Sequence, residues 1–409
     1  MLRYLTIFYW ILAFVFLVGG AMQFLGIISN TISTMAIGLV IIAMLVGNKV
    51  KVPANHLPVF YLIILTLISA LVNSVSPVLT IMYMFNFILV PFFIYRFIAA
   101  RVINRINRRK LFRFFILVGL IQLPVLLFQR IFALQLTYMA AKTLSVVDVG
   151  FGTFFFKNDH GLCFFLLCMI IYLLYDTELY VSKVQKTFLI IYYSVTIALS
   201  NSYISFLLLI MVYGFYFLGR LNVKRIILSA LVLLLLYGAV TTISFLQEIV
   251  GDKYEHLERK AINKDDEFDA EKRDLSEAER GDIVMFYLAQ DISVIGKGPY
   301  DYFDPVKGEF RTFANFSQYI WFYNDLGILG VIGVIFYYVS LYLANYKLKN
   351  YRIIFLVLIV IYSFFTNTLS DLAFNIVFAF FILKDSPYLI SNLKEYEYSL
   401  YTIPRLEEN

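Results

Sequence analysis

The chain has 409 residues, of which 61% are hydrophobic, 18% aromatic and only 15% charged, and its formal net charge is +6. A soluble protein of this length could not cover so much apolar surface with so few charges. The basic residues are spread over short links between apolar runs, so no nucleic-acid partner is expected. The composition predicts an all-α integral membrane protein.

Apolar runs divide the chain into about twelve expected transmembrane helices, because roughly 20 residues cross the ~30 Å hydrocarbon core. The runs lie near 5–26, 32–47, 57–72, 78–97, 113–128, 160–175, 187–200, 203–219, 226–245, 316–344, 353–369 and 371–383. Helices one to nine thus occupy 1–245, one large external loop occupies 246–315, and helices ten to twelve occupy 316–383 before a cytoplasmic tail at 384–409. Residues 129–159 are expected to form an external amphipathic or re-entrant segment.

Lysine and arginine residues set the expected orientation, because the cytoplasmic links of membrane proteins are enriched in both. The links after the second, fourth, sixth, eighth and tenth helices are basic, most strongly between Arg96 and Arg113. These links share one side of the membrane if the amino terminus is inside. We therefore expect a multi-pass protein of the cytoplasmic (inner) membrane, with both termini cytoplasmic and the large loop periplasmic.

Charge concentrates in the expected external loop, since residues 247–311 hold more than half of the chain's 28 Asp and Glu residues. Ser276 and Glu279 fit a capping box, which predicts a helix that ends at a later glycine-rich turn. Arg280 lies in the first turn of that helix, where it either pairs with a neighbouring glutamate or binds an anion. Arg311 has the same two interpretations.

The other external link, residues 129–159, brings Arg130, Lys142 and Asp159 near His160 in the sequence. A lone histidine is more often structural than functional. A histidine beside a carboxylate and basic residues at a membrane surface is nevertheless a candidate for proton transfer or ligand binding. Both interpretations of His160 remain open at this point.

Several short segments follow one another in an order typical of one enzyme family. They are Gly150-Phe151-Gly152-Thr153-Phe154 with Asn158-Asp159-His160-Gly161, then Leu199-Ser200-Asn201-Ser202, then Arg280 with Gly296-Lys297-Gly298-Pro299-Tyr300, and then Asn315 to Tyr319 with Asn324-Asp325-Leu326-Gly327-Ile328-Leu329-Gly330. With the span count and the loop position, they resemble the O-antigen polymerase and O-antigen ligase family. These are membrane glycosyltransferases that act on glycans linked to undecaprenyl diphosphate. The resemblance covers about residues 150–345.

Two positions depart from the ligase pattern. Ligases carry an arginine where this chain has Tyr203, and a histidine where it offers Asn315 or Phe316. The resemblance therefore favours the polymerase branch, which joins undecaprenyl-diphosphate-linked oligosaccharide repeat units at the outer face of the membrane. A ligase that transfers glycan to lipid A core remains the alternative.

The resemblance implies glycosyl transfer without a metal or another cofactor, because pyrophosphate is already a good leaving group and the enzyme mainly has to hold it. The expected catalytic residues are His160, Asp159 and Arg280, and the expected substrate-binding residues are Arg130, Lys142, Arg280, Arg311, Tyr300 and Tyr319. For the base, His160 and Asp159 rank first and His256 follows. The tyrosines either stack on sugar rings or anchor the membrane interface. Expected partners are the lipid-linked oligosaccharides, the lipid bilayer, a chain-length regulator and a flippase.

A transporter or flippase for lipid-linked glycans is the rival from another class. Such a protein needs ionisable groups inside its spans. The expected spans hold few of them, with Asp325 and Asp371 near span ends and neutral amides elsewhere. The enzyme interpretation is therefore preferred.

The orientation predicts different labelling of two engineered cysteines. A cysteine replacing Lys264 should react with a membrane-impermeant thiol reagent in intact cells, because the large loop is expected outside. A cysteine replacing Asn107 should react only after the membrane is permeabilised. Labelling is compared with that of the parent chain, whose Cys163 and Cys168 lie within one expected span. Labelling of the Asn107→Cys protein in intact cells would overturn the orientation.

Overall fold

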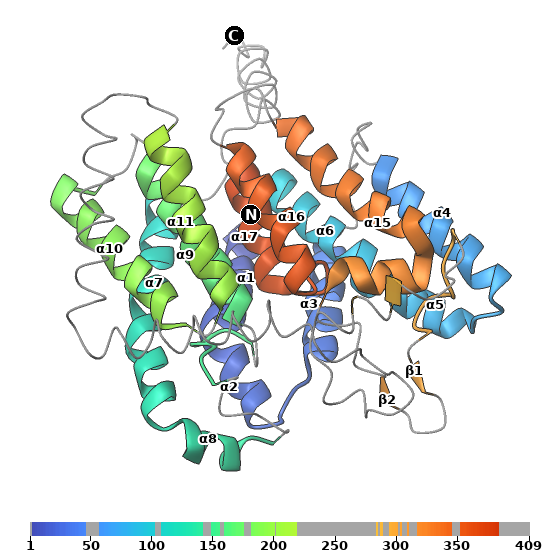
Figure 1. The fold of residues 1–409 in the computed structure, drawn as a ribbon, viewed down its shortest axis with the longest axis horizontal. Helices are drawn as coiled ribbons and strands as arrows, with labels where there is room; N and C mark the ends of the chain where they lie inside the picture. The colour runs from blue at the N-terminus through green and yellow to red at the C-terminus, as the bar shows by residue number, and fades with distance from the viewer. Residues whose placement is uncertain are drawn as a thin grey trace, which may run out of the picture.

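A computed structural model shows a helical protein (Figure 1). The structure describes residues 2–45, 57–102, 108–141, 149–155, 159–175, 181–200, 202–218, 284, 287–288, 294–301, 303–304, 309–310, 317–345 and 352–383. The expected span at 226–245 lies outside these residues, as do most of the large loop and the carboxyl-terminal tail.

Helices occur at the other expected span positions, because a helix satisfies its own backbone hydrogen bonds within an apolar run. In chain order they are α1 (Leu2–Ala13), the π-helix η1 (Phe14–Val18), α2 (Gly19–Phe24), α3 (Asn30–Leu45), α4 (Leu57–Val72), α5 (Pro77–Met84), the π-helix η3 (Phe85–Leu89), α6 (Val90–Phe97), the π-helix η4 (Ile98–Val102), α7 (Arg108–Ile131), α8 (Ala133–Met139), α9 (Asp159–Tyr175), α10 (Lys183–Leu199), α11 (Tyr203–Leu218), α15 (Gln318–Asn345), α16 (Ile353–Phe365) and α17 (Leu372–Leu383). The large loop adds a small antiparallel ribbon in which β1 (Phe303–Asp304) pairs with β2 (Glu309–Phe310).

Several of these helices have the length and the surface of membrane-embedded helices. In the described part of the chain, four are long and apolar enough to cross a membrane, namely Tyr4–Phe24, Pro77–Ala100, Lys110–Ile131 and Gln318–Ala344. Large apolar side chains point outward, with Trp10 71%, Leu71 80% and Val184 80% exposed. Lipid solvates such a surface and water does not. The expected class, a helical membrane protein, is confirmed at this level.

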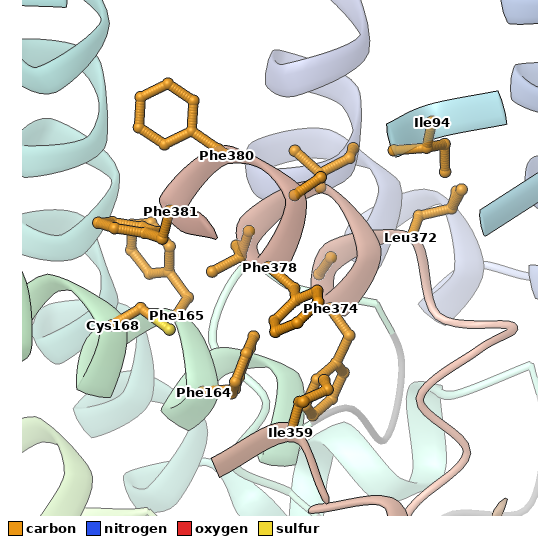
Figure 2. Close-up of a cluster of buried hydrophobic side chains, with 14 of the residues drawn as sticks. Ile94, Phe164, Phe165, Cys168, Ile359, Leu372, Phe374, Phe378, Phe380 and Phe381 are labelled. Carbon is orange, nitrogen blue, oxygen red and sulfur yellow. The ribbon is translucent and has the colours of Figure 1, made fainter. Parts of the chain in front are cut away.

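Helix α17 lies in the middle of the bundle, between α7, α9 and α11 on one side and α4, α5 and α15 on the other (Figure 1). All residues over Leu372–Ile382 are buried. Phe374 stacks on Phe164 of α9 with ring centroids 4.7 Å apart (Figure 2). Phe380 meets Phe115 of α7 edge-on at 5.2 Å. Aromatic pairs of this kind contribute about 0.5–1.5 kcal/mol each beyond their burial.

The link between α7 and α9 divides into an exposed helix and a buried loop. Helix α8 buries none of its residues, and Tyr138 is 83% exposed. In contrast, residues 149–155 are buried, apart from the partly buried Thr153. Residues 149–155 are therefore not part of an amphipathic helix at the surface. They enter the bundle as non-helical chain.

Hydrogen bonds to two glutamines of α7 replace water around this buried loop. The Gln129 side chain donates to the carbonyl of Gly152 and accepts from its N–H, both at 2.8 Å. The Gln122 side chain accepts from the N–H of Thr153 at 3.0 Å and donates to its hydroxyl at 2.8 Å. The Thr153 hydroxyl donates to the carbonyl of Phe16, in π-helix η1. Non-helical backbone inside an apolar bundle is tolerated only with such internal partners.

The buried loop also needs a glycine on the neighbouring helix α2. A Cβ added at Gly20 would overlap the carbonyl oxygen of Phe154. Gly20→Ala should therefore destabilise the folded protein by about 1–3 kcal/mol, the usual cost of overpacking. Gly214→Ala is the matched control, because nothing lies within 4 Å of a Cβ added there. Thermal unfolding of the detergent-purified proteins makes the comparison. Equal melting temperatures for the Gly20→Ala protein and the parent would contradict the close packing.

Candidate functional site

Two helix ends that carry predicted site residues lie at one end of the bundle. Arg130 is near the end of α7 and His160 near the start of α9, and both contact residues close to the end of α10 and the start of α11. The Nη2 group of Arg130 donates to the carbonyl of Leu199 at 3.1 Å. The Nδ1 atom of His160 lies 2.7 Å from the Oγ atom of Ser202. The fold therefore brings together two segments that resemble separate motifs of one family.

Groups of opposite charge lie within electrostatic range of each other at this end. Asp159 is the first residue of α9, where the helix dipole favours a carboxylate. Asp159 and Tyr203 are both near enough to Arg130 to act on its charge. Arg130 is exposed, and Asp159 and His160 are partly exposed. A guanidinium group carries five N–H donors, so Arg130 keeps donors for an anion beyond the one that it gives to Leu199.

A chain of hydroxyl groups leads from His160 into the bundle. Ser202 forms hydrogen bonds to His160 on one side and to the hydroxyl of Ser205 on the other. The Ser205 Oγ atom lies 2.6 Å from the phenolic oxygen of Tyr362, on α16. The two serines and the tyrosine are at most 1% exposed. We call these four residues the histidine–hydroxyl chain.

The carboxyl end of α16 joins this chain to the point where the large loop returns to the bundle. The Ser317 hydroxyl donates to the carbonyl of Ser363 at 3.4 Å, one residue after Tyr362. The backbone N–H of Gln318 donates to the carbonyl of Thr366 at 3.2 Å. The start of α15 is thus fixed beside the buried end of the histidine–hydroxyl chain.

Helix α15 is broken at Gly327, whose φ of 68° and ψ of −165° are not helical. Figure 1 shows the bend that results, near α4 and α5. A carbonyl in a helix normally accepts from the N–H four residues later. The break therefore leaves the carbonyls of Asn324 and Asp325 in need of other partners.

Residues 294–301 of the large loop, which we call the docked loop, supply these partners. The N–H groups of Lys297 and Gly298 donate to the two carbonyls at 2.8 and 3.0 Å. Gly296 has a φ of +75°, and a Cβ there would overlap the backbone of Asp325. Only glycine combines that conformation with so close an approach. The glycine-rich turn expected here is present.

The carboxylate of Asp325 holds the docked loop from inside. Its Oδ2 atom accepts from the backbone N–H of Tyr300 at 3.2 Å and from the indole N–H of Trp321 at 2.9 Å. Its Oδ1 atom accepts from the side-chain amide of Asn324 at 3.0 Å. These donors explain how a carboxyl group with no exposed surface is accommodated in the bundle.

Both tyrosines expected at the substrate site are packed inside the protein. Tyr300 is 6% exposed, its ring meets that of Tyr83 edge-on at 5.2 Å, and its phenolic oxygen accepts from the Asn86 amide at 3.3 Å. Burial raises the pKa of Tyr300 to about 12, so the phenol stays neutral at physiological pH. Tyr319 is 4% exposed, and its hydroxyl donates to the carbonyl of Val360 at 3.1 Å. These contacts favour packing over sugar stacking.

The remaining sequence expectations lie outside the described residues. They concern Lys142, Arg280 and Arg311, the candidate base His256, the capping box from Ser276 to Glu279, and Asn315 and Phe316 of the re-entry motif. Within the described ranges, no three His, Cys, Asp or Glu side chains gather in a group that could hold a metal ion.

Sequence reasoning missed Ser205 and Tyr362. Ser202, just before α11, and Ser205, in its first turn, are three residues apart at the start of an apolar run, a spacing that puts two side chains on the same side of a helix. That spacing was the available signal for the first two hydroxyls. Tyr362 lies 157 residues after Ser205 and is one of 31 tyrosines, so no local pattern identified it.

Removing the Asp325 carboxylate should release the docked loop. Asp325→Ala leaves buried N–H donors without an acceptor, at a cost of about 1–3 kcal/mol for each donor. We expect amide hydrogen exchange at Lys297, Gly298 and Tyr300 to become at least about tenfold faster. Asp301→Ala is the control, because this exposed carboxylate lies on the same loop. Unchanged exchange in the Asp325→Ala protein would show that the carboxylate does not hold the loop.

The chain was also compared with known proteins. No protein-family model, no curated protein and no solved structure matches it. The function is therefore argued from the residue pattern and from the geometry of the site.

Proposed function

We propose that this protein is a membrane glycosyltransferase that polymerises O antigen or a similar surface polysaccharide. The hydroxyl group of an acceptor repeat unit attacks the anomeric carbon of the donor glycan. A carbon–oxygen bond forms there while the bond from that carbon to the diphosphate oxygen breaks. Undecaprenyl diphosphate leaves with the electron pair, and the hydroxyl proton passes to a carboxylate or to water.

One observation carries this proposal. Arg130, Asp159 and His160 lie together at one end of an apolar helix bundle, where Arg130 contacts Leu199 and His160 contacts Ser202. They are a cation that can bind a diphosphate, a carboxylate that can accept a proton, and an imidazole that can form a hydrogen bond or exchange a proton. The motifs that carry the sequence resemblance include Asp159, His160 and residues 199–202, and Arg130 lies before them in the sequence.

Arg130 would bind the diphosphate. A guanidinium donates two parallel hydrogen bonds to phosphoryl oxygens and keeps its charge next to lipid. Fixed positive charge also stabilises the negative charge that grows on the leaving group, without a metal ion. Arg280 and Arg311 of the large loop, with Lys142, are proposed to add to this binding. Asp159 would accept the proton of the attacking hydroxyl.

The proposal places the reaction at the periplasmic face of the cytoplasmic membrane. Lipid-linked repeat units are then delivered by a flippase, and a chain-length regulator is a further proposed partner. Both follow from the class of reaction, since its two substrates are lipid-linked and its product grows stepwise.

Two alternatives are less well supported. A ligase of the related branch would need the arginine that Tyr203 replaces. A flippase would need an ionisable group that faces a path through the bundle. Asp325, a buried carboxylate within the described spans, accepts hydrogen bonds from Tyr300, Trp321 and Asn324. Its contacts are those of a structural group.

Deletion of the gene, followed by gel analysis of the surface polysaccharide, tests the proposal. Loss of a polymerase should leave a single repeat unit on the lipid core. Core with no repeat unit at all would indicate a ligase or a flippase. An unaltered polysaccharide ladder would contradict the whole assignment.

Complementation of the deletion strain tests the role of Arg130. Arg130→Ala should reduce polymerisation by about 10- to 100-fold, which corresponds to the loss of a hydrogen bond to a charged group. Arg130→Lys should recover part of it, because a point charge replaces the planar fork. Lys183→Ala is the control, since this exposed lysine lies at the other end of α10. A full ladder with Arg130→Ala would remove Arg130 from the site.

A further inference from the structure

The histidine–hydroxyl chain sets which nitrogen of His160 carries the proton. We propose that the chain holds His160 in the neutral form with its hydrogen on Nε2. Ser202, Ser205 and Tyr362 are then positioning residues, and a ligand atom that binds the Nε2 atom of His160 must be a hydrogen-bond acceptor, such as an anionic oxygen. The ligand part of this inference rests on the proposed function, in which that oxygen belongs to the diphosphate.

The buried end of the histidine–hydroxyl chain, at Tyr362, determines which group donates each hydrogen bond. The Tyr362 phenol has no exposed surface, and Ser205 is the hydrogen-bond partner that the structure gives it. A phenol can accept a hydrogen bond and also has one hydrogen to donate. If Ser205 donated to Tyr362, the phenolic hydrogen would be buried without an acceptor. Tyr362 therefore donates to Ser205.

The remaining hydrogen bonds, as far as the imidazole of His160, are donated in the same direction. The Ser205 oxygen accepts from Tyr362, and the single Ser205 hydrogen is buried and needs an acceptor of its own, so Ser205 donates to Ser202. Ser202 in turn donates to the Nδ1 atom of His160, 2.7 Å away. A nitrogen that accepts a hydrogen bond bears no proton. The hydrogen of neutral His160 is therefore on Nε2.

This tautomer gives His160 and Asp159 different roles in the proposed reaction. The Nε2 atom of His160 acts as a donor, so its partner must be an acceptor such as a phosphoryl oxygen. Under the proposed function, His160 of α9 and Arg130 of α7 then both donate hydrogen bonds to the diphosphate. Asp159, the residue before His160 in the sequence, then accepts the proton of the attacking hydroxyl.

The tautomer can be measured directly on the full-length protein in lipid bilayers. His56→Gln and His256→Gln leave His160 as the sole histidine, and ¹⁵N–¹³C correlation spectra of labelled protein identify the protonated nitrogen. Nε2 is bonded to Cδ2 and Nδ1 to Cγ, so the two forms give different correlations. The spectra are recorded at about pH 8.5, well above the ordinary imidazole pKa of about 6.5.

We expect the proton on Nε2, in a ratio of about ten to one or more over Nδ1, because the reverse chain leaves a buried hydrogen without an acceptor. Tyr362→Phe in this background should give a mixture of both tautomers. Ser205→Ala, a smaller change, breaks the chain at another point and should have the same effect. Tyr193→Phe is the control, since that buried hydroxyl donates to the carbonyl of Ile116 at 3.3 Å, outside the chain.

Two results would overturn the inference. One is a proton on Nδ1, or an even mixture of the two tautomers, in the protein that keeps both Ser205 and Tyr362. The other is an unchanged Nε2–H form after both Tyr362→Phe and Ser205→Ala. Neither result depends on activity, so the inference can fail while the proposed function stands. A deletion strain with an unaltered polysaccharide ladder would refute the function and leave the tautomer as found.

Discussion

Every polar group placed inside this apolar bundle must find its partner within the protein, and the rest of the structure depends on that constraint. Gln122 and Gln129 satisfy a non-helical loop that enters the bundle beside α2. The break at Gly327 exposes two carbonyls, and the docked loop supplies their donors. In a low-dielectric interior each such group would cost several kcal/mol if left unpaired, on the order of the net stability of a folded domain.

The same constraint explains how the candidate site is built. The end of the large loop is fixed to α15 through the Asp325 carboxylate, and α15 is fixed to α16 through Gln318. Helix α16 carries Tyr362, the buried end of the histidine–hydroxyl chain, whose other end is His160. Loop, kinked helix and imidazole are thus joined by successive hydrogen bonds. Under the proposed function, this would hold the substrate-binding loop in a fixed relation to the groups that act on the diphosphate.

The sequence predicts the helical class and most helix positions, because continuous apolar runs can satisfy their backbone only as helices. It also predicts the docked turn, since Gly296 and Gly298 signal backbone that other residues avoid. It does not predict the break at Gly327, because a single glycine in an apolar run is compatible with a straight helix. It likewise misses the burial of residues 149–155, which depends on two glutamines more than 20 residues earlier.

The candidate site likewise has features that the sequence predicts and features that it does not. Arg130, Asp159 and His160 stand out in the sequence because they lie in or next to the expected external link at 129–159, and the other short external links hold few Lys and Arg residues. Their grouping could not be derived, since the contact between His160 and Ser202 joins residues 42 positions apart. Tyr300 and Tyr319 show the opposite case. Aromatic residues at a membrane interface suggest sugar binding, but both are buried against neighbouring helices.

In the proposed mechanism, an arginine, a carboxylate and an imidazole at one end of the bundle support glycan transfer without a metal ion. Purified protein in lipid vesicles, given undecaprenyl-diphosphate-linked repeat units and EDTA, tests it most directly. The account predicts products longer than one repeat unit and release of one undecaprenyl diphosphate for each bond formed. Activity that disappears in EDTA and returns with magnesium or manganese would contradict it.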